Sequence, residues 1–156
     1  MHETEKERLN RNLDQLLQEL RVAIPGVQVL FAFLLVAPFS TRFDLADQFE
    51  RVVYFVALLF AALSAVLLLA PSIQHRILFR QDQKAYLVSA GTVLSIAGLT
   101  ALACSSTLAV VLVAHFLYGA WAAAIAGGFA FLAYAVIWYV IPIHRRLHSH
   151  PVDDET

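Results

Sequence analysis

The sequence predicts an all-α integral membrane protein, a four-helix bundle preceded by an N-terminal amphipathic helix. Of the 156 residues, 60% are hydrophobic and 15% are charged, whereas soluble domains average about 45–50% and about 25%. The charges are also segregated, because residues 22–41, 52–75 and 85–144 contain no Asp, Glu, Lys or Arg. This pattern excludes a soluble domain, a disordered chain and a nucleic-acid-binding protein. It also lacks the polar–apolar alternation of a membrane barrel.

Residues 1–21 form the predicted amphipathic helix. Its leucines recur at helical spacing, while charged residues take the other faces: Leu9, Leu13, Leu16, Leu17 and Leu20. Such a helix can lie on the cytoplasmic leaflet with its leucines at the acyl boundary and its basic residues near lipid phosphates. Two alternatives remain open: a short oligomer seam, and a helix that packs on the loops of its own protein.

Four membrane spans are predicted within residues 22–143. About 20 helical residues cross the hydrocarbon core, so the first two charge-free stretches each hold one span and the third holds two. The spans lie near residues 22–39, 52–70, 85–113 and 116–143. The turn between the last two falls either at residues 105–107 or later, within residues 115–119. Pro25 and Gly26 predict a kink where the amphipathic helix enters the first span.

The basic residues predict the orientation. All the Lys and Arg residues except Arg42 and Arg51 fall in the N-terminal segment, the middle loop and the C-terminal tail. The positive-inside rule then places both termini and the middle loop in the cytoplasm. Residues 144–156 are expected to be a flexible cytoplasmic tail. No cleavable signal peptide is expected, because the first 21 residues lack its short apolar core.

Two loops contain candidate polar sites. In the first loop, Asp47-Gln48-Phe49-Glu50 has the form of a capping box with Asp47 as the N-cap. Asp44 could join Asp47 and Glu50 around a divalent cation, although their spacing is not that of a calcium loop. In the middle loop, Arg76 and Arg80 lie one turn apart. With Arg21 they are candidates for binding lipid headgroups, and charges that only fix the topology explain them equally well.

Three polar residues within the spans are candidate site residues. Gln28 should face other helices, either as an interhelical hydrogen-bond partner or as a pore contact. Ser95 belongs to a row of hydroxyls in the third span that could line a polar path, although hydroxyls also bond to carbonyls of their own helix. His115 is expected near the outer turn and bonded to a carbonyl, with a lone proton-relay residue as the alternative.

Small residues at helical spacing mark faces where helices can approach closely in lipid. The rows are Ala57, Ala61 and Ala65 in the second span, Gly91, Ser95 and Gly98 in the third, and Gly119, Ala123 and Gly127 in the fourth, with Ala120, Ala124 and Gly128 beside them. The fourth span therefore has more small rows than one neighbour can use. The spare row is available to a second subunit.

We expect no catalytic site and no cofactor. The sequence contains no nucleophile elbow, P-loop or dinucleotide fingerprint. His144 and His148 have the four-residue spacing of metal ligands on a helix, but no zincin glutamate or nearby cysteine completes a site. They are therefore only weak metal candidates.

Three strings resemble a family of small actinobacterial four-span membrane proteins catalogued as a domain of unknown function. They are LQELRV at residues 17–22, PGVQVLFAFLL at residues 25–35 and HRILFR at residues 75–80. The resemblance covers most of residues 10–143 and implies four spans. It carries over no activity, cofactor or catalytic residue, and it draws attention to Glu19, Arg21, Gln28, His75 and Arg76 without giving them roles.

The expected function is that of a non-enzymatic structural or accessory component of the cytoplasmic membrane. Its expected partners are the lipid bilayer and a second copy or other membrane proteins. One alternative is a small homo-oligomeric channel or transporter lined by the polar third span. Another is a membrane enzyme or metal protein that uses the C-terminal histidines.

Overall fold

The computed structural model describes residues 5–41, 43–78 and 84–148, and within them all regular structure is helical. The all-α prediction is confirmed, and four helices are long and apolar enough to cross a membrane. The elements are α1 (Glu5–Val36), η1 (Ala37–Phe39), η2 (Phe43–Leu45), α2 (Gln48–Leu78), α3 (Lys84–Tyr118), α4 (Ala120–Ala135), η3 (Val136–Val140) and α5 (Ile141–His148). The η1 and η2 segments are short 3₁₀ turns, whereas η3 is a π-helical turn that joins α4 to α5.

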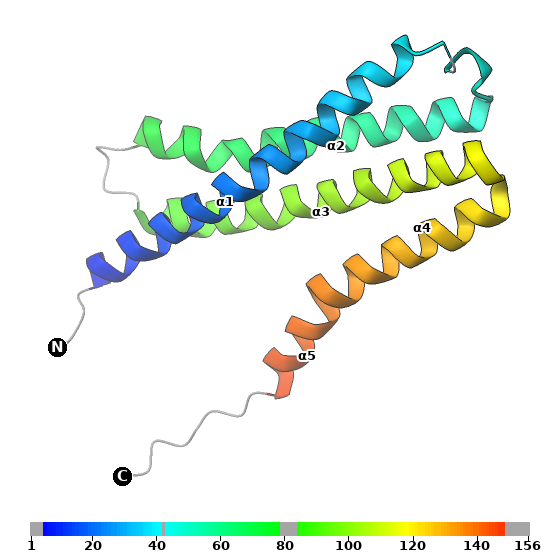
Figure 1. Ribbon diagram of the computed structural model, residues 1–156. Helices are drawn as coiled ribbons and strands as arrows, with labels where there is room; N and C mark the ends of the chain where they lie inside the picture. Colours follow the sequence, from blue (N-terminus) through cyan, green and yellow to red (C-terminus); the bar gives the residue numbers. More distant parts are fainter. Residues whose placement is uncertain (1–4, 42, 79–83, 149–156) are drawn as a thin grey trace.

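Successive long helices run in opposite directions, and α1 lies obliquely across the α2–α3 pair (Figure 1). The α1–α2 connection and the α3–α4 turn lie together at one end of the molecule, called here the loop end. The start of α1 and the end of α5 lie toward the other end. Among the described elements, α4 packs against α3 but makes no contact with α1 or α2. The molecule is thus a three-helix core with a fourth helix on one side.

The first helix is continuous through Pro25. It is 32 residues long, or about 48 Å at 1.5 Å per residue, and Figure 1 shows it as a single oblique rod. Pro25 is exposed, so the backbone bond that its missing N–H removes lies on the outward face. The amphipathic segment and the first span are therefore one element, and no separate surface helix precedes the membrane helix.

The leucine face of this helix packs inside the protein. Buried residues recur every seven positions along it: Leu13, Leu20, Val27 and Leu34. Leu20 and Val27 form a core cluster with Leu68 of α2. The interpretation of these leucines as a lipid anchor is thus wrong for Leu13 and Leu20. The physical reason is that the uninterrupted helix keeps one face on α2 and α3 from Leu13 to Leu34.

Small and hydroxyl side chains let α2 and α3 pack closely. Gly98 faces Leu68, and a Cβ at Gly98 would lie 2.7 Å from Leu68 Cγ. Ser64 Oγ donates a hydrogen bond of 2.8 Å to the Gly98 carbonyl, and Ser105 Oγ donates one of 2.8 Å to the Ala57 carbonyl. Both serines are fully buried. Ser105 therefore takes part in the contact between α2 and α3. Residues 105–107 lie within α3, and the chain does not turn there.

The chain turns instead at Gly119. This glycine has a φ of 85°, a left-handed conformation that favours glycine because it has no Cβ. Its N–H donates to the His115 carbonyl at 2.8 Å, and its own carbonyl accepts from Ala123 N–H at 3.2 Å. Residues 116–118 consequently belong to α3, and the fourth span begins at Ala120. At the other end of this span the helix continues to His148, so residues 144–148 are helical where a flexible tail was expected.

Candidate functional site

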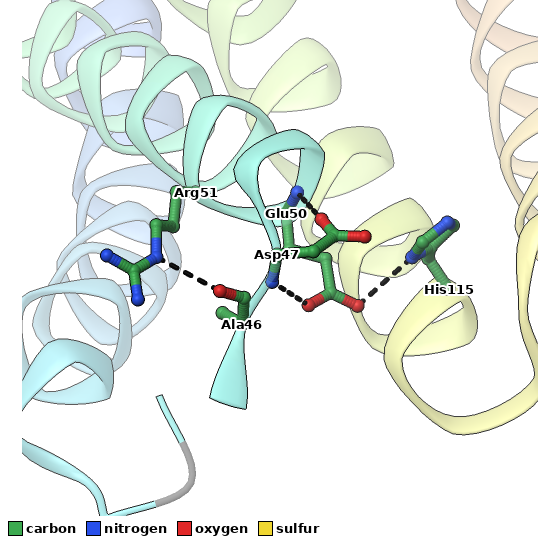
Figure 2. Close-up of polar contacts among 5 residues, drawn as sticks. All are labelled: Ala46, Asp47, Glu50, Arg51 and His115. Atoms are coloured by element: carbon green, nitrogen blue, oxygen red, sulfur yellow. Dashed lines mark hydrogen bonds and ion pairs between the residues drawn. The ribbon is translucent and has the colours of Figure 1, made fainter. Parts of the chain in front are cut away.

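The start of α2 is fixed by the predicted capping box, which the structure confirms. Asp47 Oδ1 accepts a hydrogen bond of 2.8 Å from the Glu50 N–H, and Glu50 Oε2 accepts one of 3.0 Å from the Asp47 N–H (Figure 2). Each carboxylate thereby satisfies a backbone donor that has no partner within the helix. Each also has a second oxygen that the box does not use.

Glu50 extends from this box to the end of α3. Its Oε1 lies 3.0 Å from His115 Nδ1, and Figure 2 shows the two side chains pointing toward each other. The Glu50 residue is only 6% exposed, and the His115 side chain is 20% exposed. His115 is therefore bonded to a carboxylate, whereas the sequence led us to expect a backbone carbonyl as its partner. The carbonyl of His115 is used separately, to close the α3–α4 turn.

The only arginine drawn beside this cluster points away from it. Arg51 Nε donates to the Ala46 carbonyl at 3.0 Å, which ties the arginine to the preceding loop (Figure 2). Among the described residues, no lysine or arginine forms an ion pair with Asp47 or Glu50. Within the described residues, the imidazole of His115 is thus the side-chain partner of Glu50 from another helix.

Two cavities flank the Glu50–His115 contact. One, of about 350 Å³, is lined by Glu50 together with Phe43 and Leu112. The other, of about 440 Å³, is lined by His115, Phe49 and the α4 residues around Ala123. The Phe49 ring also stacks obliquely on the imidazole, with 4.9 Å between ring centroids. The cluster is therefore held by apolar contacts and still has space beside it.

The other predicted candidates do not meet at one site. Arg21 and Arg76 are exposed on α1 and α2, and Arg80 lies outside the described residues. Gln28 is exposed on α1, next to the contact with Ala65 and Leu68 of α2. Ser95 Oγ donates to the Gly91 carbonyl of its own helix at 2.7 Å.

The two C-terminal histidines, His144 and His148, lie on α5. Their rings stack nearly parallel, with centroids 4.2 Å apart and planes 15° apart. His148 Nδ1 also lies 2.9 Å from the His144 carbonyl oxygen.

The sequence indicated the end of the bundle at which Glu50 and His115 lie, but it did not indicate that they form a pair. An even number of antiparallel spans brings the start of the second and the end of the third to the same end of the bundle. Each of those ends has one buried or half-buried ionisable residue. Their contact joins positions 65 apart in the chain, so no local pattern could reveal it.

Comparison with known proteins gives one match. The model of a family of unknown function (DUF6328) matches residues 2–142. No curated protein matches the chain, and no solved structure does.

Proposed function

This chain belongs to that family of unknown function, and we propose that it is a small multi-pass integral membrane protein acting as a non-enzymatic structural or accessory component of the cytoplasmic membrane. Four apolar helices support the membrane assignment. Residues 22–41, 52–75 and 85–144 contain no Asp, Glu, Lys or Arg, which agrees with this assignment because charged side chains at membrane depth are costly and mark transport pathways.

The hydrogen-bond partners of the hydroxyl groups in α3 are the observation that supports a structural role over transport. Thr92, Ser95 and Thr100 of α3 each donate to a carbonyl one turn earlier in the same helix, at 2.7–2.8 Å. Ser64 and Ser105 bond across the α2–α3 contact. These groups serve helix packing, and none of them needs a water-filled path to satisfy it. This argument favours a structural role over a channel lined by the third span.

An ion-flux assay tests this proposal. We expect liposomes containing the protein to release K⁺ or take up protons no faster than empty liposomes under an imposed gradient. A channel-forming peptide added at the end confirms that the vesicles were sealed and loaded. Flux that depends on the protein and falls in a Thr92→Val variant would replace the structural role with the channel.

We also propose that the accessory role involves a second copy of the chain. Ala123 and Gly127 are buried against α3, whereas the neighbouring row Ala120, Ala124 and Gly128 is exposed. Exposed small residues at four-residue spacing allow a second helix to approach closely in lipid. Gly128→Leu should reduce dimer cross-linking in membranes, whereas Gly26→Leu, at an equally open glycine of α1, should not. Equal cross-linking in both variants would place the contact elsewhere.

A further inference from the structure

We propose that Asp47, Glu50 and His115 bind a divalent transition-metal ion, with Zn²⁺ as the best fit, and that the ion clasps the start of α2 to the end of α3. One ligand atom from each residue lies within 4.8 Å of the others. Carboxylate oxygen and imidazole nitrogen are established zinc ligands, and three protein ligands leave a fourth position for water. The imidazole favours zinc over Mg²⁺ and Ca²⁺, which prefer oxygen alone.

The distances are close to those of a zinc site. With metal–ligand distances near 2.1 Å, two ligands of a tetrahedral ion are about 3.4 Å apart. Glu50 Oε1 and His115 Nδ1 are already 3.0 Å apart, so an ion between them requires only a small separation. Asp47 is exposed, and its ligand atom lies within 4.8 Å of the other two, so a small approach of the three groups completes the set. Cavities lie beside Glu50 and beside His115, so the cluster has open space next to it.

The capping box would orient the ligands. One oxygen of each carboxylate accepts a backbone N–H, and these are Asp47 Oδ1 and Glu50 Oε2. The other oxygen of each carboxylate is left for the metal. Hydrogen bonds from outside the ligand set commonly orient metal-binding carboxylates in this way. The same four residues that start the helix therefore prepare half of the site.

The cluster also has two carboxylates and one imidazole, so a cation would find more negative than positive groups there. Two carboxylates lie together, and one of them, Glu50, is almost fully buried. Arg51, the basic residue nearest to them in the chain, is bonded to the Ala46 carbonyl. Buried charges in proteins are normally paired or bound to metal ions. A divalent ion would balance both carboxylates.

The test uses the full chain in mild detergent, with His144, His148 and His150 replaced by Asn so that the tail cannot bind metal. This parent protein is first stripped of metal with a chelator and is then loaded with Zn²⁺. It should retain one Zn²⁺ per chain through dialysis. Its Co²⁺ form should show the visible absorption of a tetrahedral site. Zn²⁺ should also raise its unfolding temperature, because a ligand that binds only the folded state stabilises it.

Two variants separate metal binding from folding. Asp47→Ser keeps an N-cap oxygen but removes a metal ligand, and His115→Gln leaves the capping box intact. Each should weaken Zn²⁺ binding by about tenfold or more, which corresponds to about 1.4 kcal/mol. The matched control Asp44→Asn removes a nearby carboxylate outside the cluster and should bind Zn²⁺ like the parent.

Three results would overturn the proposal. The first is a parent protein that retains no Zn²⁺. The second is unchanged Zn²⁺ affinity in Asp47→Ser or in His115→Gln, since the proposed site requires both ligands. The third is an equal loss of affinity in Asp44→Asn, which would indicate general attraction of cations to the acidic loop. If one variant fails to fold, the other decides the outcome.

Discussion

Glu50 is the residue that links local and long-range structure at the loop end. One of its carboxylate oxygens caps α2, and the other contacts His115 on α3. The first role could be predicted from four consecutive residues, because a capping box is a local pattern with fixed spacing. The second could not, because it depends on how α2 and α3 are rotated about their axes. Many side-chain contacts across the bundle set that rotation.

At the same scale, two adjacent glycines of α4 should respond oppositely to alanine. A Cβ at Gly127 would lie 2.4 Å from Val111 Cγ2, whereas a Cβ at Gly128 would meet nothing within 4 Å. Valine has little rotameric freedom in a helix, so Gly127→Ala should cost about 1–3 kcal/mol through overpacking. Gly128→Ala should be neutral or slightly stabilising, because alanine favours helix. Unfolding of metal-free protein in mixed micelles measures both, and equal losses would mean that α4 does not pack on α3 through Gly127.

Among the elements, α1 shows most clearly what the sequence could predict and what it could not. The leucine periodicity correctly indicated a helix, but the partner of the leucine face was misjudged. A seven-residue repeat runs past Pro25 without a change of register, through Leu13, Leu20, Val27 and Leu34. This repeat was the evidence in the sequence for one continuous helix. Reading Pro25 as the boundary divided the repeat into two. Proline on an outward face costs a single backbone bond that does not affect the packed face.

The packing of α1 predicts a clear difference between two neighbouring positions. Leu20 is 3% exposed and Val22 is 79% exposed. Leu20→Ala should lower the free energy of unfolding by about 2–5 kcal/mol, since it leaves a cavity against Leu68. Val22→Ala should change it by about 0.5 kcal/mol or less. Thermal or denaturant unfolding in detergent compares them. Similar small effects at both positions would restore the interpretation of the leucines as a lipid contact.

For the whole molecule, composition and charge segregation were enough to predict the helix class and the number of long apolar helices. Both are properties of the sequence alone, because a helix in lipid must satisfy its own backbone. The asymmetric packing, with α4 on α3 alone, was not predicted. Every span is apolar on all sides, so hydrophobic periodicity gives no information about which faces meet. Only the rows of small residues indicated the faces, and α4 has two.

The orientation expected from the basic residues places both termini in the cytoplasm, and it predicts the accessibility of introduced thiols in intact cells. Thr41→Cys lies at the loop end and should react with an impermeant thiol reagent. Ser149→Cys, which lies outside the described residues, should react only after the membrane is permeabilised. Both substitutions are made in a Cys104→Ser background so that the native thiol does not contribute. The reverse pattern of labelling would invert the topology, and the loop end would then face the cytoplasm.

The turn at Gly119 has a consequence for how the chain is inserted during biosynthesis. Gly119 is a one-residue connection whose N–H and carbonyl are both bonded to neighbouring turns, and residues 85–144 contain no formal charge. No hydrophilic loop has to be translocated between α3 and α4. The two can therefore enter the bilayer together as a helical hairpin. Because the backbone of α4 approaches α3 and neither α1 nor α2 among the described helices, its docking does not depend on the completed contacts of α1, and the last helix can join a core that has already assembled.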